Sequence, residues 1–348
     1  MKNQMMAAVL YGKEQLNVEP VAVPEIEKSD VLVRVKAALT CGTDVKVFRR
    51  GYHARMIVPP ALFGHELAGD IVAVGSDVKG FRVGQRVVAA NSAPCLECYY
   101  CKRGLENLCD DLLFNNGAYA EYIRIPGRIV KRNMYEIPPH VNYQDAALIE
   151  PLACVMRGLE ETHIRPGDTV SVIGLGPIGL MFVRLAKVYG ARVIAIGRRP
   201  TQLDRAARMG AEELLSTGAG SHDNILKTIK DLTKGRGVDV AIEAVGKPDT
   251  WQMAVKMVRR GGTVNFFGGC PSESHITLET SLLHYSEITC KASFHHTPMH
   301  IRKALESVSR GEITARDFVN REEPLTNLLE VMRHLMSHNG HMKTAIIP

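Results

Sequence analysis

The sequence predicts an α/β protein of two domains, an antiparallel β-barrel and a doubly wound parallel sheet. Three observations support this prediction. A length of 348 residues is enough for two cores. Residues 1–150 hold short alternating runs between Gly and Pro turns, and from Arg165 onward strands alternate with helices. With 45% apolar and 23% charged residues, the composition is typical of a globular enzyme.

The predicted barrel depends on four short runs in which apolar and polar residues alternate. They are DVLVRVKAAL (30–39), LAGDIVAVG (67–75), GQRVVAA (84–90) and YAEYIRIP (119–126). Such runs, separated by Gly and Pro turns, are typical of an antiparallel barrel.

The second domain begins with a strand, a glycine-rich turn and a helix. The apolar run TVSVIGLG (169–176) leads into apolar residues at helical spacing, and ARVIAIG (191–197) is again β-rich. The turn holds G-x-G-x-x-G, made by Gly174, Gly176 and Gly179 with Pro177 and Ile178 between them. In a dinucleotide site these glycines permit the turn, admit the pyrophosphate and let the helix pack closely. Glycines also merely end strands, but this context predicts dinucleotide binding.

The alternation of strands and helices continues to residue 294. Further β-rich runs are GVDVAIEAVG (237–246), GGTVNFFGG (261–269) and SEITCKASF (286–294), with helical segments such as DTWQMAVKMVRR (249–260) between them. The chain then returns to helix and ends in the strand-like KTAIIP (343–348). We therefore predict domains at 1–155 and 156–294, with 295–348 returning to the first domain.

Half of the eight cysteines lie in one stretch of fifteen residues. They are Cys95, Cys98, Cys101 and Cys109, spaced C-x2-C-x2-C-x7-C. The N-terminus has no signal-peptide pattern and no apolar run is long enough to span a membrane, so we expect a cytoplasmic protein with reduced thiols. Four thiolates with no open position predict a structural zinc site. An iron–sulfur cluster and four unrelated cysteines are the alternatives.

The charge balance argues against a nucleic-acid partner. The net charge is +6, from 43 Lys plus Arg and 37 Asp plus Glu, and no long basic run interrupts the chain. A zinc-ribbon protein that binds nucleic acid has a concentrated basic stripe with interleaved aromatics. A mild positive balance suits an anionic cofactor or substrate instead.

A second possible metal site lies in the first domain. Cys41 comes from LTCGTDVKVF, His65 and Glu66 come from FGHELAG, and Glu150 comes from ALIEPLACV. A thiolate, an imidazole and a carboxylate bind zinc and leave one position for a substrate. Taken singly, these residues also fit a core cysteine, a buried hydrogen-bonded histidine and a helix-end glutamate.

The order of these motifs resembles the zinc-containing medium-chain alcohol dehydrogenases. CGTD, GHE, the four-cysteine stretch, IEP and GLGPIG follow one another across nearly the whole chain. The branch that it resembles most is that of sorbitol (polyol) and threonine dehydrogenases. The resemblance implies a GroES-like barrel that carries the metal, a Rossmann domain, and an active site between them. It also implies hydride transfer between an alcohol and a nicotinamide cofactor, with two zinc ions per chain.

The resemblance assigns roles residue by residue. Cys41 and His65 match catalytic zinc ligands, Glu150 stands where other members have a second cysteine ligand, and Glu66 matches a ligand in some relatives. Asp44 matches the residue that orients the histidine.

Proton transfer is the step at which the chain departs from the family pattern. Thr43 matches the hydroxyl that takes the proton of the alcohol. Lys46 stands where many relatives have a relay histidine, and His53 is a possible substitute.

The cofactor prediction rests on the end of the second strand of the Rossmann pattern. NAD-binding proteins place an Asp or Glu there for the ribose 2′-hydroxyl, but this chain has Gly197. Arg198 and Arg199 follow, and a guanidinium there can bind a 2′-phosphate. We therefore expect NADP to be preferred over NAD. The alternative is a turn glycine followed by two solvated arginines.

The predicted activity is hydride transfer between the carbinol carbon of a polar secondary alcohol and a nicotinamide cofactor, by a homo-oligomer, a dimer or a tetramer. Loops 43–52 and 114–119 and the strand end ASFHHTP (292–298) are expected to line the pocket, and they are polar. They favour a polyol, a sugar alcohol or a hydroxy acid. A zinc-free quinone reductase, a zinc-ribbon regulator and an activity on a hydroxy amino acid are the competing hypotheses.

Overall fold

The computed structural model describes residues 3–53, 55–218, 222–337 and 342–348. The chain forms two compact units. The first comprises residues 1–153 and 296–348, and the second comprises residues 154–295.

The first unit is built mainly from strands. Its strands are β1 (Gln4–Gly12), β2 (Gln15–Ala22), β3 (Val31–Leu39), β4 (Ala61–Leu62), β5 (Glu66–Val74), β6 (Arg86–Ala89), β7 (Ser92–Ala93), β8 (Leu113–Phe114), β9 (Tyr122–Ile125), β10 (Met134–Glu136), β17 (Val319–Pro324) and β18 (Lys343–Ile347). Its helices are α1 (Gly42–Arg50), α2 (Gly127–Asn133), α3 (Tyr143–Ala147), the start of α4 (Ile149–Glu160), α10 (Pro298–Ser309), α11 (Ala315–Phe318) and α12 (Leu328–Ser337). Short 3-10 turns occur at η1 (Cys101–Arg103), η2 (Glu106–Leu108) and η3 (Leu325–Asn327).

These strands pair almost entirely in antiparallel fashion, which confirms the predicted barrel. The main sheet has the order β10-β6-β5-β3-β18-β17, with β9 also paired to β3, and a smaller sheet has the order β2-β1-β4. The pair β17–β18 is parallel, an exception that the sequence did not indicate. The unit's core holds large buried side chains such as Phe48, Phe63 and Tyr119. Burying each of them contributes roughly 1.5–3 kcal/mol to folding.

The second unit is a parallel sheet with helices. Its strands are β11 (Thr169–Ile173), β12 (Arg192–Gly197), β13 (Glu213–Ser216), β14 (Val238–Glu243), β15 (Val258–Phe266) and β16 (Thr289–Ala292). Its helices are α5 (Pro177–Val188), α6 (Pro200–Arg208), α7 (His222–Leu232), α8 (Pro248–Met257) and α9 (Thr280–Tyr285), together with the rest of α4.

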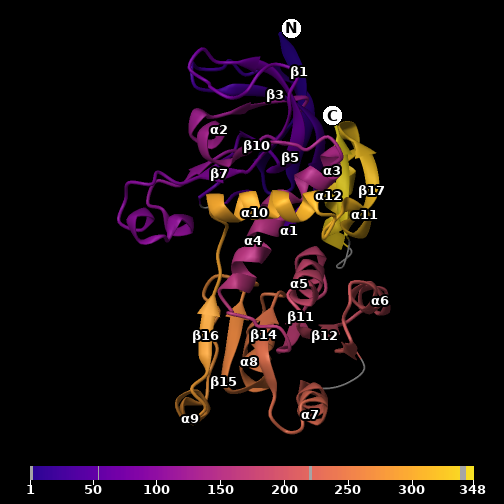
Figure 1. Ribbon diagram of the computed structural model, residues 1–348. Coiled ribbons are helices and arrows are strands. Elements are labelled where there is room, and N and C mark those ends of the chain that lie inside the picture. The colour runs from indigo at the N-terminus through magenta and orange to yellow at the C-terminus, as the bar shows by residue number, and fades with distance from the viewer. Residues whose placement is uncertain (1–2, 54, 219–221, 338–341) are drawn as a thin grey trace. The chain divides into compact units, whose positions relative to one another are not determined.

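The strand order of the second unit is β13-β12-β11-β14-β15-β16, and every pair is parallel. Figure 1 shows α5 and α6 beside the strands of this sheet. The predicted doubly wound parallel sheet is therefore confirmed. One boundary differs, because β15 already begins at Val258, where the sequence predicted that the preceding helix would continue. Val258 pairs with Val238 of β14, so the sheet determines where this helix ends.

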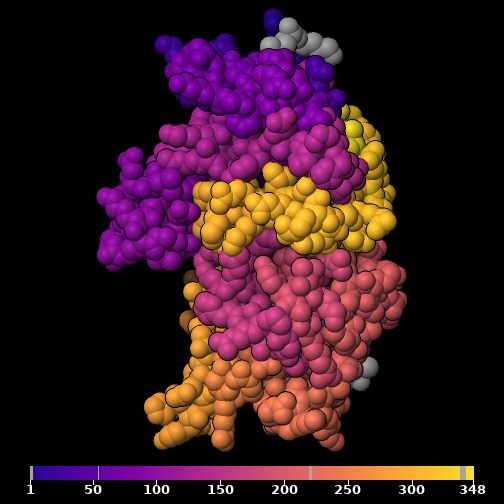
Figure 2. Space-filling model, viewed as in Figure 1, coloured from indigo at the N-terminus to yellow at the C-terminus, as the bar shows by residue number. Residues whose placement is uncertain are grey.

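One surface feature of the first unit bears on function. The segment that holds the four clustered cysteines projects from this unit, as Figure 2 shows in purple. Among the described residues, no helix is long and apolar enough to cross a membrane.

Candidate metal centres and dinucleotide site

The first candidate metal centre lies where α1 begins. Cys41 is the N-cap of α1, and its sulfur accepts a hydrogen bond from the backbone of Thr43 at 3.4 Å. In return, Asp44 accepts one from the backbone N–H of Cys41 at 3.1 Å. Cys41 and Asp44 thus cap the start of α1 reciprocally, which fixes the position of the thiol.

His65 is oriented by the same aspartate. Its Nδ1 lies 2.9 Å from Asp44 Oδ1, and both side chains are buried. Burial alone would lower the pKa of His65, but the Asp44 carboxylate and the Cys41 thiol raise it well above its usual value. What stabilises a proton on this ring also stabilises a metal ion, and the bond to Asp44 leaves Nε2 for that ion.

Tyr119 and Gly64 hold this aspartate in place. The hydroxyl of Tyr119, a fully buried residue, donates to Asp44 Oδ2 at 2.6 Å. Gly64 has a φ of +90°, and a Cβ there would lie 2.5 Å from the Tyr119 ring. Only glycine both adopts this positive φ without strain and leaves room for the Tyr119 ring, so packing requires a glycine in front of His65.

Glu66 completes a cluster of three possible ligands. The ligand atoms of Cys41, His65 and Glu66 all lie within 4.8 Å of one another. Burial raises the pKa of Glu66 to about 7, although the ammonium of Lys343 opposes this shift. Lys343 is buried and donates to both Glu66 oxygens, at 2.7 and 2.6 Å. No sequence motif pointed to this lysine.

Glu150 lies in the first turn of α4 and is also buried. Burial raises the pKa of Glu150, and the nearby cations of His65 and Lys343 oppose this shift. Its carboxylate lies 3.9 Å from Nε2 of His296, a buried residue whose Nε2 also lies 3.1 Å from Asn91 Oδ1. The structure thus places Glu150 among polar buried groups, at the start of a helix.

The four clustered cysteines form the second candidate metal centre. Their ligand atoms lie within 4.8 Å of one another, and three of the sulfur–sulfur separations are 3.4, 3.9 and 4.0 Å. Thiolates that share one zinc at ~2.3 Å in tetrahedral geometry are ~3.8 Å apart. The separations fit a single ion better than an iron–sulfur cluster, whose ligands bind different iron atoms.

Backbone groups favour the thiolate form of Cys95 in this lobe, whereas burial raises the pKa of Cys101 and of Cys109 in the absence of a metal. Cys95 Sγ accepts hydrogen bonds from the backbone N–H groups of Glu97 and Cys98, at 3.4 and 3.3 Å. These bonds lower the pKa of Cys95 to about 6. A thiol with such a pKa is largely ionised at neutral pH, as metal binding requires.

The glycine-rich turn between β11 and α5 has the geometry of a phosphate-binding turn. Gly174 has a φ of +93°, and a Cβ at Gly179 would lie 1.7 Å from the Gly174 carbonyl oxygen. At Gly176, the N-cap of α5, a Cβ would meet no atom within 4 Å, so the backbone is open to a ligand. Pro177 and Ile178 form the first turn of the helix, whose free N–H groups attract anions.

The end of β12 carries the predicted cofactor-selecting residues. Gly197 is buried and is the last residue of β12, and a Cβ there would lie 2.7 Å from Leu175 Cδ1. Arg198 is exposed, and Arg199 is half-buried at the N-cap of α6. Because β11 and β12 are parallel neighbours, both turns lie at the carboxyl edge of the sheet, where dinucleotides bind in such folds.

The residues considered for proton transfer lie in or near α1. Thr43 is half-buried in its first turn, whereas Lys46 is exposed. His53 Nδ1 accepts hydrogen bonds from the backbone N–H groups of Arg55 and Met56, at 3.2 and 3.1 Å. Burial and neighbouring cationic groups, including His65, lower the pKa of His53.

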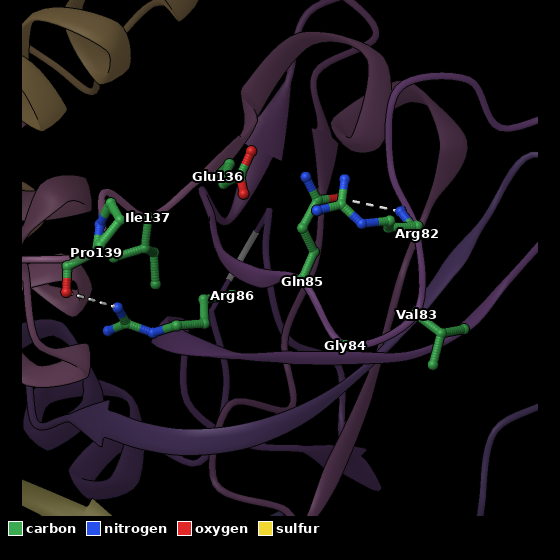
Figure 3. A pocket seen from close by; sticks show the side chains of 8 residues that line it. All are labelled: Arg82, Val83, Gly84, Gln85, Arg86, Glu136, Ile137 and Pro139. Carbon is green, nitrogen blue, oxygen red and sulfur yellow. Dashed lines mark hydrogen bonds between the residues drawn. The ribbon is translucent and has the colours of Figure 1, made fainter.

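A shallow pocket of about 360 Å³ lies elsewhere on the first unit. Figure 3 shows its lining, in which Arg86 donates to the Pro139 carbonyl and the backbone of Arg82 donates to Gln85. None of its lining residues belongs to either metal centre, so this pocket carries no argument about the chemistry.

Comparison with known proteins decides the family. Residues 27–138 match the alcohol dehydrogenase GroES-like domain, and residues 177–310 match the zinc-binding dehydrogenase domain. Sorbitol dehydrogenase of Bacillus subtilis (strain 168) is 34% identical over 99% of this chain and 97% of its own length. This chain belongs to the zinc-binding dehydrogenases.

Two further relatives of this zinc-binding dehydrogenase are informative. L-threonine 3-dehydrogenase of Bacillus licheniformis is 36% identical over 73% of both chains. A solved structure of a zinc-binding dehydrogenase from Sinorhizobium meliloti 1021, bound to NADP, has a TM-score of 0.90 and 30% identity, with 100% of both chains covered. The chain is thus an oxidoreductase with a GroES-like domain and a Rossmann-like sheet, as its motifs predicted. A zinc-ribbon regulator is excluded.

Proposed function

We propose that this zinc-binding dehydrogenase transfers hydride between the carbinol carbon of a polar secondary alcohol and NADP. The observation that carries the proposal is the cluster of half-buried Cys41 with buried His65 and Glu66, together with the buried Glu150, whose carboxylate is close enough to His65 for their charges to interact. A zinc-free quinone reductase has no use for a thiol, an imidazole and carboxylates in one buried place.

The donor set at this cluster fits zinc. Cys41 and His65 would hold the ion, with Glu150 or Glu66 as the third ligand, and the four-cysteine lobe would hold a second, structural ion. When bound, a zinc ion with an open position supplies a Lewis acid that lowers the pKa of an alcohol hydroxyl.

The chain's own residues supply orientation and proton transfer. Asp44 keeps the His65 ring in one orientation and fixes which nitrogen carries the proton. The half-buried hydroxyl of Thr43, two residues after Cys41, is proposed to take up the proton of the alcohol while its own proton passes to solvent water. Burial of Asp44, His65 and Glu66 strengthens the electrostatic interactions among them.

A polyol, a sugar alcohol or a hydroxy acid is the proposed substrate class. Polar groups near the cluster support it, because His296 and Asn91 are buried beside Glu150 and could bind hydroxyls. The sorbitol dehydrogenase relative at 34% identity supports a polyol. The L-threonine 3-dehydrogenase relative at 36% identity makes a hydroxy amino acid the second candidate.

The preference for NADP is supported by two features of this chain and by one relative. The acid that binds the ribose 2′-hydroxyl in NAD enzymes is replaced by Gly197, and two arginines follow. The Sinorhizobium meliloti structure, at 30% identity, holds NADP.

The test combines metal analysis with a substrate panel. Purified protein should contain about two zinc ions per chain and should reduce NADP with at least one polyol, sugar alcohol or hydroxy acid. Cys41→Ser should abolish turnover and keep about one zinc, whereas Cys290→Ser, at an exposed cysteine outside both centres, should change neither. Less than one zinc per chain, with activity on quinones instead, would overturn the proposal.

A further inference from the structure

A half-buried histidine follows α1, and the backbone holds its ring in one orientation. Nδ1 of His53 accepts hydrogen bonds from the backbone N–H groups of Arg55, at 3.2 Å, and Met56, at 3.1 Å. The backbone of His53 also pairs with that of Ile57 in both directions, at 2.9 and 3.3 Å, and Ile57 is buried in the core of the first unit. Two separate sets of contacts therefore fix this histidine.

These contacts decide where the ring carries its proton. A backbone N–H group can only donate, so Nδ1 of His53 must offer its lone pair to the two groups that it faces. In a neutral imidazole the proton then lies on Nε2. Burial and the nearby charges of His65, Arg50 and Arg55 lower the pKa of His53, which also favours the neutral ring.

A ring in this state is unsuited to relaying a proton. A relay takes up a proton on one ring nitrogen and releases a proton from the other. Nε2 of His53 already carries a proton, and a proton on Nδ1 would be set against two backbone N–H groups. The geometry therefore argues against His53 as a substitute for the relay histidine, and it leaves Nε2–H as a hydrogen-bond donor.

The histidine lies near the candidate catalytic centre. It is close enough to His65 for their charges to interact. The side-chain amide of Asn116 donates to the carbonyl oxygen of Met56 at 2.8 Å, which ties this turn to the loop that leads to Tyr119, the partner of the aspartate in the centre. Among the residues that the structure describes, Nε2 of His53 has no hydrogen-bond partner, so this donor is available to a ligand.

We propose that His53 is a specificity-determining residue whose Nε2–H donates a hydrogen bond to a substrate oxygen other than the one that reacts. A neutral donor suits a second hydroxyl of a polyol or a sugar alcohol. A site built to bond such a hydroxyl disfavours an alcohol that lacks it, because the donor then stays unpaired. This inference rests on the proposed function, since it requires an alcohol to react at the centre formed by Cys41 and His65.

The variant His53→Asn separates this role from a purely structural one. An asparagine side-chain oxygen also accepts hydrogen bonds from backbone N–H groups a few residues further on, so the turn keeps its acceptor. The shorter side chain has no donor at the position of Nε2. His140→Asn is the matched control, because His140 is an exposed histidine of the first unit that belongs to neither metal centre.

The first measurement is the tautomer of His53, by nitrogen-15 NMR of protein labelled at its histidines. The signal of His53 is the one that His53→Asn lacks. At neutral pH it should show a protonated Nε2 and an unprotonated Nδ1. A proton on Nδ1, alone or together with one on Nε2, would overturn the inference. This readout needs neither metal nor substrate.

The second measurement is the ratio of kcat/KM for sorbitol to kcat/KM for 2-propanol, which has a single oxygen. His53→Asn should lower this ratio about fivefold, as loss of one hydrogen bond does, with an unchanged melting temperature. His140→Asn should change neither quantity. If His53 relayed the proton, both alcohols would react more slowly by the same factor and the ratio would not change.

The outcomes separate this inference from the proposed function. An unchanged ratio in folded His53→Asn, with a wild type that oxidises sorbitol, would refute the inference and leave the proposed function standing. An equal fall in His140→Asn would also refute it. If the wild type oxidises no polyol, the proposed function fails for this substrate class and the inference fails with it.

Discussion

The proposed preference for NADP should be reversible at the end of β12, and the structure allows the size of the effect to be worked out. Arg198 is exposed, so removing its contact with a 2′-phosphate in Arg198→Ala should cost about 1 kcal/mol, the upper range for exposed ion pairs. Adding a carboxylate in Gly197→Asp, about 5 Å from a phosphate of charge near −2, contributes about 2 kcal/mol of repulsion at an effective dielectric constant near 60.

The double variant Gly197→Asp/Arg198→Ala should therefore disfavour NADP by about 3 kcal/mol, or roughly 150-fold. A new side chain at Gly197 must also displace the Leu175 Cδ1 atom, which would lie 2.7 Å from its Cβ. Gly197→Ala is the matched control, because it has the same steric conflict and no charge. Its steric cost falls on both cofactors, so it should leave their ratio unchanged.

The assay is the ratio of kcat/KM for NADP to kcat/KM for NAD, measured with one alcohol for every variant. Arg236→Ala serves as a second control. Arg236 is an exposed arginine that precedes β14, so it lies at the amino ends of the parallel strands, away from the carboxyl ends where the cofactor is expected. A wild type that favours NAD tenfold would refute the reasoning. A ratio that changes equally in Gly197→Ala and Gly197→Asp would show that packing, and not charge, selects the cofactor.

Three further predictions test the other sites. Gly176→Ala should leave the melting temperature unchanged and raise the KM for the cofactor at least about tenfold. Gly179→Ala should lower the melting temperature, because its Cβ would lie 1.7 Å from the Gly174 carbonyl oxygen. Equal melting temperatures would contradict this assignment of the glycines. Cys98→Ser should lower the free energy of unfolding by about 2–5 kcal/mol, by analogy with loss of a disulfide, and a loss of activity without a change in melting would show that the lobe is not structural. Glu150→Ala should lower the metal content of the centre at Cys41 and His65, or depress kcat strongly. Normal kinetics in the fully metallated variant would instead assign the ligand role to Glu66.

The parts of the fold that could be predicted are those encoded by short segments. The run 30–39 is rich in β-forming residues, and β3 spans Val31–Leu39 as expected, buried except at Arg34 and Lys36. The four-cysteine lobe and the glycine-rich turn are also local, since each needs only about fifteen neighbouring residues. The start of β15 at Val258 could not be read from the same information, because it depends on pairing with Val238.

Lys343 shows why the environment of the candidate centre was harder to predict than its possible ligands. It is separated from Glu66 by 277 residues, and it stands at the start of a strand-like segment near the end of the chain. A lysine in such a place is ordinarily solvated. Only the register of β18, β3 and β5 turns it into the buried partner of a carboxylate.

Asp44 is the opposite case, because its position is set by local spacing. In CGTD the aspartate lies three residues after Cys41, the spacing of a capping box, so Oδ2 reaches the backbone N–H of Cys41 at 3.1 Å. Its other oxygen, Oδ1, is then 2.9 Å from His65 Nδ1. One carboxylate therefore fixes both the start of α1, which presents the thiol, and the orientation of the imidazole. The family resemblance assigned Asp44 to His65, and the capping-box spacing explains how Asp44 is positioned, whereas the pairing of Glu66 with Lys343 depends on strand register.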